Sequence, residues 1–374
     1  ASPTPFFHVI LSNMPREQRF AGVEAGGTSF VVAIAEGTPD NIVERADFPT
    51  TTPEEVMDKC IAWLKVRKFD SLGIASFGPI DLHTHSKTYG FITSTPKVLW
   101  TNTDVLGKIV RGLGLKQNFP VAWETDVNAP AMAEYDILHS RGTPVDSVAY
   151  VTVGTGCGIG LVFRGMPVHG LLHGEGGHIS VPRCPGDDYV PPKTMLKCEE
   201  WNELETMVNS QSLAARANCS SVHELKDLPD DHPVWDVAAH YLACLCANTI
   251  LLCSPEKIVL SGGVLKRSIL FPKIRERTRR YLNSYIDVPR LTTDKIDQVI
   301  VPSDYGNNAG IIGALFIGKM KKAEMKTSHD DVWRPAPMAW EQTGSSPTLI
   351  RYLSAVAFGA AVTFVASSLL AKKR

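Results

Sequence analysis

The chain has 374 residues, and its 38 Lys and Arg residues nearly balance its 39 Asp and Glu residues. This length exceeds what a single hydrophobic core usually supports and predicts two lobes or domains. The chain has no excess of positive charge that would attract a polyanion, which argues against nucleic acid as a partner. The eight cysteines are scattered, and three lie in an apolar helix-like run, which indicates a reducing compartment.

Residues 1–19 are expected to form a leader ahead of the first strand. They contain a short apolar patch, Phe6 to Leu11, but neither the basic region nor the long apolar stretch of a secretory signal. We therefore expect no secretion signal here. The composition suits a transit peptide only weakly.

The folded part opens with two strands joined by a glycine turn. Phe20–Glu24 and Phe30–Ala35 are apolar or β-branched, and Ala25-Gly26-Gly27-Thr28 between them predicts a tight hairpin. A helix is predicted to begin after Thr52 as N-cap and to run to about Lys68, because a proline and two acids follow the cap. A strand follows at Ser71–Ser76.

The second part repeats the strand, glycine turn and strand order. Val148–Val153 and Gly158–Phe163 flank Gly154-Thr155-Gly156-Cys157, which predicts a second hairpin and two related lobes. The other predicted elements are a strand at Val121–Trp123, a helix at Ala129–Arg141, a helix at Val234–Cys253, a strand at Lys257–Leu260, a glycine turn at Ser261–Val264 and a helix at Ala309–Lys322. This order is typical of an α/β protein.

The C-terminal residues have the composition of a membrane span. Leu353–Ala371 carries no charge, and at about 1.5 Å of helical rise per residue this stretch matches the thickness of the hydrocarbon core. Arg351 and Tyr352 precede it and Lys372-Lys373-Arg374 follow, as interfacial residues do. Residues 323–350 are expected to be a linker to this transmembrane helix at 351–374, because Trp333–Pro347 is rich in Pro, Gly and Ser. A buried core helix is the alternative.

Small residues recur along one face of this predicted helix. Ala355, Gly359, Thr363 and Ser367 follow one another at intervals of four residues. Such a face allows two helices to approach closely in lipid, although a tail rich in Ala and Ser produces the pattern easily. It is a candidate seam for helix pairing.

Three glycine turns are candidates for binding phosphate. Gly26-Gly27-Thr28 and Gly154-Thr155-Gly156 can each present backbone N–H groups and a hydroxyl to phosphate oxygens, and Gly262-Gly263 forms a third turn. None has the spacing or the lysine of a P-loop. A single glycine turn is usually only a hairpin, but the repetition of the turns favours a nucleotide site.

Asp126 is the candidate catalytic base. It follows a buried strand, where a carboxylate can face a cleft, and phosphoryl transfer to an alcohol needs a carboxylate that takes the hydroxyl proton. The alternative is that Asp126 caps the following helix, a role that Asn128 can also fill. Glu175, His178 and Glu200 lie in or near a glycine-rich loop and could accept sugar hydroxyls, although such residues are usually solvated.

Together these motifs resemble the ROK (repressor, open reading frame, kinase) family, and within it the fructokinase branch most closely. The resemblance covers roughly residues 20–320. The segments that carry it are Gly22–Thr28, Gly73–Leu82, Ser86–Lys97, Thr125–Glu134, Val151–Gly160, Gly174–His178, Pro255–Val264 and Asn308–Gly313.

The resemblance implies a two-lobed, actin-like ATPase fold of the ribonuclease H-like type. The expected N-terminal lobe spans residues 20–128, and the C-terminal lobe with a returning helix spans residues 129–322. The expected ligands are a hexose and ATP, with Mg²⁺ held mainly through the phosphates. A homodimer is expected from the family.

The resemblance also assigns roles to residues. Asp126 matches the catalytic base. The implied ATP-binding residues are Gly26, Gly27, Thr28, Thr155, Gly156, Gly262 and Gly263. The implied sugar-binding residues are Glu175, His178, Glu200 and Thr125. Thr125 stands where glucose-type members carry Asn, which favours the fructokinase branch.

Two positions depart from the family pattern. Ser29 stands where members commonly carry Lys, so one charge near the phosphates is missing. Members of the branch typically bind zinc, yet after His178 only Cys184 and Cys198 remain as ligands, fewer than a tetrahedral structural site needs. We therefore predict no zinc.

The predicted activity is ATP-dependent phosphorylation of a hexose, with fructose preferred. Mannose, glucose or an N-acylhexosamine are alternative substrates, because small differences in pocket shape decide between such sugars. A sugar sensor without turnover is an alternative of a different class. The tail predicts a kinase in the cytosol attached to the mitochondrial outer membrane or the endoplasmic reticulum.

Overall fold

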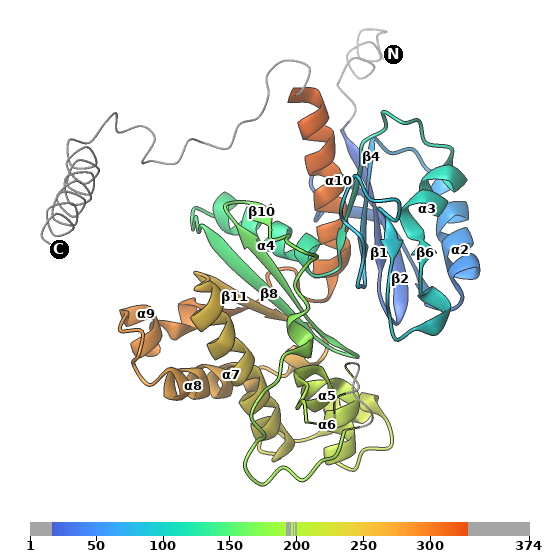
Figure 1. The fold of residues 1–374 in the computed structure, drawn as a ribbon. Helices are drawn as coiled ribbons and strands as arrows, with labels where there is room; N and C mark the ends of the chain where they lie inside the picture. Colours follow the sequence, from blue (N-terminus) through green and yellow to red (C-terminus); the bar gives the residue numbers. More distant parts are fainter. Residues whose placement is uncertain (1–16, 192–195, 197, 199, 328–374) are drawn as a thin grey trace, which may run out of the picture. The chain divides into compact units, whose positions relative to one another are not determined.

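A computed structural model describes residues 17–191, 196, 198 and 200–327 (Figure 1). The described residues up to 323 form one compact unit. The linker, the membrane helix with its small-residue seam, and nearly all of the leader lie outside the described residues.

The first half of the unit is built on a five-stranded mixed sheet. The strands are β1 (Arg19–Ala25), β2 (Ser29–Glu36), β3 (Ile42–Pro49), β4 (Ser71–Ser76) and β7 (Val121–Thr125). They lie in the order β3-β2-β1-β4-β7. β1, β2 and β3 are antiparallel neighbours, whereas β4 and β7 run parallel to β1. The hairpin predicted around Gly26 and the strand predicted at Ser71–Ser76 are therefore confirmed.

The second half contains a sheet of the same topology. Its strands are β8 (Ser147–Val153), β9 (Cys157–Phe163), β10 (Met166–Pro167), β11 (Lys257–Ser261) and β12 (Ile300–Pro302). Their order is β10-β9-β8-β11-β12, with an antiparallel meander followed by two parallel strands. The equal order in both halves confirms that the two strand–glycine turn–strand units belong to related substructures.

Nine α-helices lie in the part of the chain that the structure describes. They are α2 (Pro53–Lys65), α3 (Val105–Leu113), α4 (Asn128–Ser140), α5 (Leu204–Val208), α6 (Ser210–Arg216), α7 (Val234–Cys253), α8 (Leu270–Leu282), α9 (Pro289–Thr292) and α10 (Ala309–Thr327). α2 begins as predicted, because Thr52 Oγ1 accepts a hydrogen bond from the Glu55 N–H at 3.3 Å. It ends at Lys65, three residues before the predicted end.

Helices cover both faces of each sheet. α2 and α3 pack on one face of the first sheet, and α10 with part of α4 packs on the other. The close approach of α10 depends on Gly73, since a Cβ there would lie 1.9 Å from the Ala314 carbonyl oxygen. α5 to α8 cover one face of the second sheet, and α4 covers its other face.

Within the described residues, α7 alone is long and apolar enough to cross a membrane. Most of it is buried inside the protein: Tyr241 and Leu242 are fully buried, and Leu245 is nearly so. α7 is therefore a core helix of the second half. It gives no evidence for or against a membrane span elsewhere in the chain.

Candidate active site

Hydrogen bonds fix the shape of the turn between β1 and β2. The Gly26 N–H donates to the Ser29 carbonyl at 3.0 Å, and Thr50 Oγ1 donates to the Gly26 carbonyl at 2.7 Å. A Cβ on Gly26 would lie only 2.6 Å from the Ser29 carbonyl oxygen, so the turn needs glycine. Thr28 at its tip is exposed.

The equivalent turn of the second half faces this one. The Gly154 N–H donates to the Gly156 carbonyl at 2.8 Å, which closes the turn between β8 and β9. Thr28 Oγ1 donates to Thr155 Oγ1 at 3.2 Å, so the tips of the two turns meet. A ligand at this position can therefore contact both halves of the unit.

The third glycine turn lies beside the second. Gly262 follows β11 with a φ of +94°, and a Cβ on it would lie 2.4 Å from the Val153 carbonyl oxygen. The Gly263 nitrogen lies 3.9 Å from the position that a Cβ on Gly154 would take. The structure thus brings together the seven residues predicted to bind ATP. Their free backbone N–H groups and hydroxyls suit a polyphosphate.

Asp126 lies directly after β7 at the end of the first sheet. Its N–H donates to the Ser76 carbonyl at 2.9 Å, while its carboxylate accepts no hydrogen bond from another described residue. Burial, together with the charge of Glu175, raises the pKa of Asp126 to about 7. A carboxylate of this pKa can take a proton from a hydroxyl near neutral pH.

Thr125, rather than Asp126, accepts the first N–H of the following helix, whose N-cap residue is Val127. Thr125 Oγ1 accepts a hydrogen bond from the Asn128 N–H at 2.9 Å, and Thr125 is 2% exposed. The side chain of Asn128 bridges Glu124 on β7 and the Leu161 N–H on β9. The capping alternative for Asp126 is therefore wrong. Thr125, predicted to bind sugar, has a structural role in α4.

Glu24 is a site residue that the sequence analysis missed. It lies on β1 just before the first glycine turn, and burial followed by the charge of Asp126 raises the pKa of Glu24 to about 7. A Cβ on Gly310 would lie 2.1 Å from Glu24 Oε1, so this carboxylate packs against the start of α10. A signal was present in the sequence, because Glu24 is the only charged residue between Arg19 and Glu36.

The glycine-rich loop brings Glu175 and His178 toward Asp126. His178 Nδ1 lies 2.5 Å from Glu203 Oε1, and its Nε2 lies 3.7 Å from Glu175 Oε2. The effect of Glu175 on the pKa of Asp126 places these groups in one electrostatic cluster. Hydroxyls of a sugar could bind between them.

Glu200 does not join this cluster in the structure. It is exposed and has no described partner, whereas Glu203 is fully buried against His178. Glu205, at the start of α5, accepts a hydrogen bond from the Cys157 N–H at 2.8 Å beside the second glycine turn. The sequence analysis missed Glu203 and Glu205. Their spacing of two residues before an apolar run was the signal that could have pointed to them.

Two further histidines also lie in this region and were missed. His169 Nε2 lies 2.8 Å from Glu124 Oε2, and this hydrogen bond raises the pKa of His169. His173 Nε2 accepts a hydrogen bond from the Ile80 N–H at 3.0 Å, and His173 Nδ1 lies 3.4 Å from Glu175 Oε1. Both histidines hold the loop against the first half of the unit.

The donors present suit magnesium better than zinc. The described residues contain no group of three or more His, Cys, Asp or Glu side chains that could hold a metal ion. Glu24 and Asp126 lie close together and could assist an Mg²⁺ ion that takes its other ligands from phosphate and water. For zinc, His178 Nδ1 is occupied by Glu203 and Cys198 is exposed. These residues do not fit a zinc site, and the absence of zinc stays a prediction.

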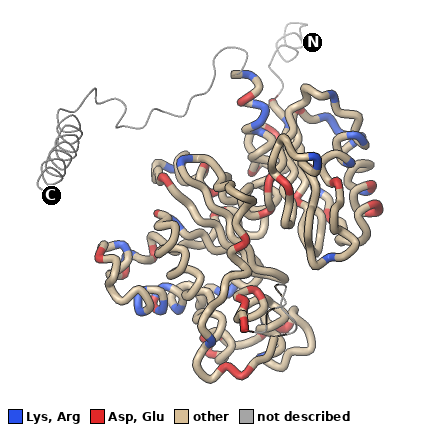
Figure 2. The backbone as a smooth tube through the Cα atoms, viewed as in Figure 1, with Lys and Arg blue, Asp and Glu red and all other residues tan. Residues whose placement is uncertain are grey.

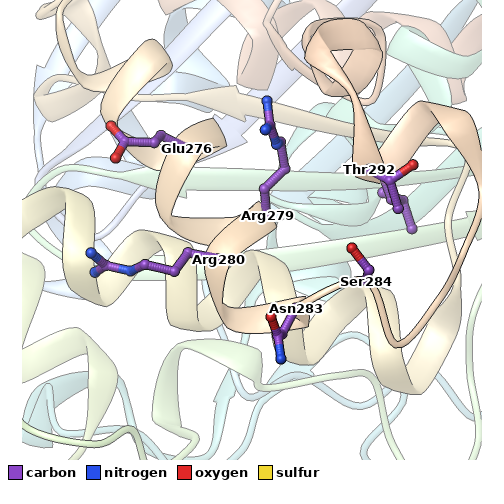
Figure 3. Close-up of a pocket in the computed structure, with 7 residues that line it drawn as sticks. Glu276, Arg279, Arg280, Asn283, Ser284 and Thr292 are labelled. Carbon is purple, nitrogen blue, oxygen red and sulfur yellow. The ribbon is translucent and has the colours of Figure 1, made fainter.

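A cavity of about 260 Å³ lies elsewhere, at the end of α8 and beside α9 (Figure 3). Basic residues gather along α8 (Figure 2). Within the cavity, Arg279 is paired with Asp294 and Arg280 lies over the ring of Tyr281. Since its two arginines already have partners and none of the glycine turns lines it, we do not assign the active site to this cavity.

Two halves of equal topology, with three glycine turns gathered beside a carboxylate, define an actin-like ATPase-type protein built to bind a phosphate chain. The profile of the ROK family matches residues 20–321. The chain therefore belongs to the ROK family, and the resemblance is confirmed.

Relatives of known name support this assignment. The chain is 37% identical over 298 residues to a fructokinase from Pediococcus pentosaceus, covering 79% of this chain and 96% of that protein. It is 35% identical over 303 residues to a fructokinase from Streptococcus mutans, covering 80% and 97%. A ROK family glucokinase from Streptomyces griseus, solved with glucose and AMPPNP, shares the fold with a TM-score of 0.63 at 21% identity, covering 81% of this chain and 99% of that one.

Proposed function

We propose that the protein is an ATP-dependent hexose kinase that converts ATP and fructose into ADP and fructose 6-phosphate. The observation that carries the proposal is Asp126, which directly follows β7 and whose carboxylate accepts no hydrogen bond from another described residue while it interacts electrostatically with Glu175 and Glu24. The named fructokinases at 35–37% identity over most of the chain support fructose as the preferred hexose.

The reaction needs one proton acceptor and one phosphate-binding region. The sugar hydroxyl oxygen forms a bond to the γ-phosphorus while the bond from that phosphorus to the ADP oxygen breaks. Asp126 takes the hydroxyl proton as this happens. The facing turns at Thr28 and Thr155 orient the phosphates, and Mg²⁺ bound with ATP neutralises part of their charge.

The test measures ATP turnover with fructose, mannose, glucose and N-acetylmannosamine in the wild type and in Asp126→Asn. We expect fructose to give the highest kcat/KM. The variant should lose about 10²- to 10⁴-fold in kcat, because general-base catalysis typically contributes this much. Asp231→Asn, the same change at an exposed residue, is the matched control.

Each alternative has its own result in this experiment. A higher kcat/KM for another hexose would reassign the substrate. Sugar binding by calorimetry without turnover of any hexose would identify a sensor. Full activity in Asp126→Asn would show that another group serves as the base.

We also propose that residues 351–374 attach the kinase to a membrane from the cytosolic side, at the mitochondrial outer membrane or the endoplasmic reticulum, and that the kinase forms a homodimer. The uncharged run Leu353–Ala371 and its basic end support the attachment. Carbonate extraction should leave the full chain in the membrane and release a chain ending at Lys326. Release of both would contradict the attachment. Analytical ultracentrifugation of the shorter chain tests the homodimer. A monomeric sedimentation coefficient would contradict it.

A further inference from the structure

The side chain of Lys97 lies over the first glycine turn. A Cβ placed on Gly27 would lie 3.3 Å from Lys97 Cε. Gly27 has no side chain, and this leaves room for the apolar stem of the lysine against the turn. The ammonium group at the end of this stem is therefore held close to the N–H groups and the hydroxyl of Gly26–Thr28.

The backbone that carries Lys97 is fixed by a buried tryptophan. Lys97 precedes the short 3₁₀ helix Val98–Trp100, and its carbonyl accepts a hydrogen bond from the Trp100 N–H at 2.7 Å. Trp100 is 2% exposed, its ring stacks on Phe30 with 5.3 Å between the centroids, and its Nε1–H donates to the Thr51 carbonyl at 3.1 Å.

These contacts tie Lys97 to the segments that shape the glycine turn. Phe30 lies in β2 directly after the turn, and Thr51 follows Thr50, whose hydroxyl holds the Gly26 carbonyl. The lysine and the turn are thus parts of one packed arrangement. Lys97 is not on a segment that could move independently of the turn.

The charge of Lys97 has no partner within the described residues. The side chain is exposed, and no carboxylate of the described chain forms an ion pair with it. By contrast, Lys59 and Lys108 in the same half are paired with Glu55 and Asp58. An unpaired ammonium group beside the N–H groups of Gly27 and Thr28, which have no acceptor among the described residues, is a site for an anion.

We propose that Lys97 Nζ contacts the phosphate chain of ATP at the Gly26–Thr28 turn. The identity of this anion rests on the proposed function, in which the turn binds ATP. A lysine binds phosphate as a point charge, and charge-assisted hydrogen bonds are among the stronger polar contacts in proteins. Lys97 therefore adds attraction for phosphate oxygens without adding affinity for the nucleoside.

The experiment compares binding of AMPPNP and of adenosine to the full chain and to its variants by calorimetry. Lys97→Met removes the charge and keeps the length of the side chain. We expect it to weaken AMPPNP binding by about 10- to 100-fold, the usual range for a charged hydrogen bond, and to leave adenosine binding unchanged. Lys97→Arg should retain most of the affinity, because the charge remains.

Two controls make the result specific. Lys116→Met makes the same change at another exposed lysine without a described partner and should bind AMPPNP like the wild type. Lys97→Gln is a second neutral variant, and both neutral variants should keep the melting temperature of the wild type because the side chain is exposed.

Wild-type binding of AMPPNP by Lys97→Met, or an equal loss for adenosine, would overturn the inference. Binding is measured apart from turnover, so the two proposals can fail separately. A wild type that binds AMPPNP through Lys97 but phosphorylates no hexose would refute the proposed function alone. A wild type that binds no AMPPNP would refute both.

Discussion

At the scale of single residues, the environment of Asp126 sets the pH at which the site works. Burial and Glu175 raise the pKa of this carboxyl to about 7. A general base must be ionised before it can accept a proton, so catalysis should increase as the pH rises through this value. Glu175 therefore affects the base through charge as well as any contact it makes with the sugar.

Replacing Glu175 by Gln should move the acidic limb of the pH profile. The change removes a negative charge that disfavours ionisation of Asp126, so the pKa of Asp126 falls and the limb shifts to lower pH. The profile of kcat/KM reports groups of the free enzyme and is the measurement to use. Glu276→Gln, at an exposed residue of α8, should leave the limb near pH 7. An unshifted limb in Glu175→Gln would show that the charge of Glu175 does not affect the pKa of Asp126.

Sequence reasoning proposed Asp126 as the base and the three glycine turns as phosphate sites because that chemistry depends on residue type and order along the chain, and the structure brings the three turns together. It assigned Glu200 where the structure places Glu203 and Glu205 beside the loop. The choice among neighbouring acids depends on which face of a turn each occupies, and no periodicity in this irregular segment reveals that. Lys97 was missed for a similar reason, because only the fold brings it to Gly27.

At the scale of elements, the 3₁₀ turn Gly176–His178 is pressed against β9. A Cβ on Gly177 would lie 1.8 Å from the Cys157 carbonyl oxygen, closer than any real contact. By contrast, a Cβ on Gly174 in the same loop would meet nothing within 4 Å. The position of His178 therefore depends on glycine at position 177 and not at position 174.

Gly177→Ala should weaken sugar binding at least about tenfold, because the turn must move away from β9 and takes His178 with it, and small displacements in a site cost rate and affinity. Gly174→Ala should bind sugar like the wild type. Calorimetric titration with fructose checks both variants. Equal affinities in the two would show that the loop adapts without moving His178.

The segment after the glycine-rich loop is held by a buried ion pair. Arg216 donates two hydrogen bonds to Asp187, at 2.9 and 2.8 Å, and Tyr241 donates a third at 2.6 Å. Burial alone would raise the pKa of Asp187, but the hydrogen bonds from Arg216 and Tyr241 lower it overall. This network supplies a cross-link in the region where the family resemblance implied zinc.

Arg216→Met should therefore lower the free energy of unfolding by about 3–5 kcal/mol, because Asp187 would be left buried without its cation. Treatment of the wild type with a zinc chelator should leave the melting temperature unchanged. Arg290→Met, at an exposed position, should change stability by no more than about 0.5 kcal/mol. Stoichiometric zinc in the purified protein, with a lower melting temperature after its removal, would refute the zinc-free interpretation.

Strongly patterned elements were the most predictable. β4 and α7 have the predicted bounds, α4 differs by one residue at each end, and β8 begins one residue earlier than predicted. β3 was missed because Glu44, Arg45 and Asp47 interrupt the apolar pattern of this edge strand. α5 and α6 were missed because they are short, although Asn209 caps the start of α6.

At the scale of the whole molecule, the proposed nucleotide site is shared by the two halves. The Thr28–Thr155 contact joins turns that lie 127 residues apart in the chain. A ligand bound to both turns stabilises the folded chain by its binding free energy, about 2.7 kcal/mol at 100 times its Kd. Ligand binding should therefore be visible in the melting temperature.

AMPPNP at 100 times its Kd should raise the melting temperature, and fructose should raise it further if both sites are intact. Adenosine at the same concentration should raise it less, because adenosine lacks the groups that reach the turns. Differential scanning fluorimetry of the full chain checks the order of these effects. A larger rise in melting temperature with adenosine than with AMPPNP would show that the nucleotide does not bind at the glycine turns.

The two halves differ most between their third strand and the helix that leads into the fourth strand, which is α2 before β4 and α7 before β11. In the first half only residues 50–52 separate β3 from α2, whereas in the second half residues 168–233 separate β10 from α7. This long insertion carries Glu175, His178 and Glu203, while the glycine turns lie in the framework that has the same topology in both halves. If the proposed roles hold, substitutions in the insertion change the choice of sugar and leave the phosphate-binding turns unaltered.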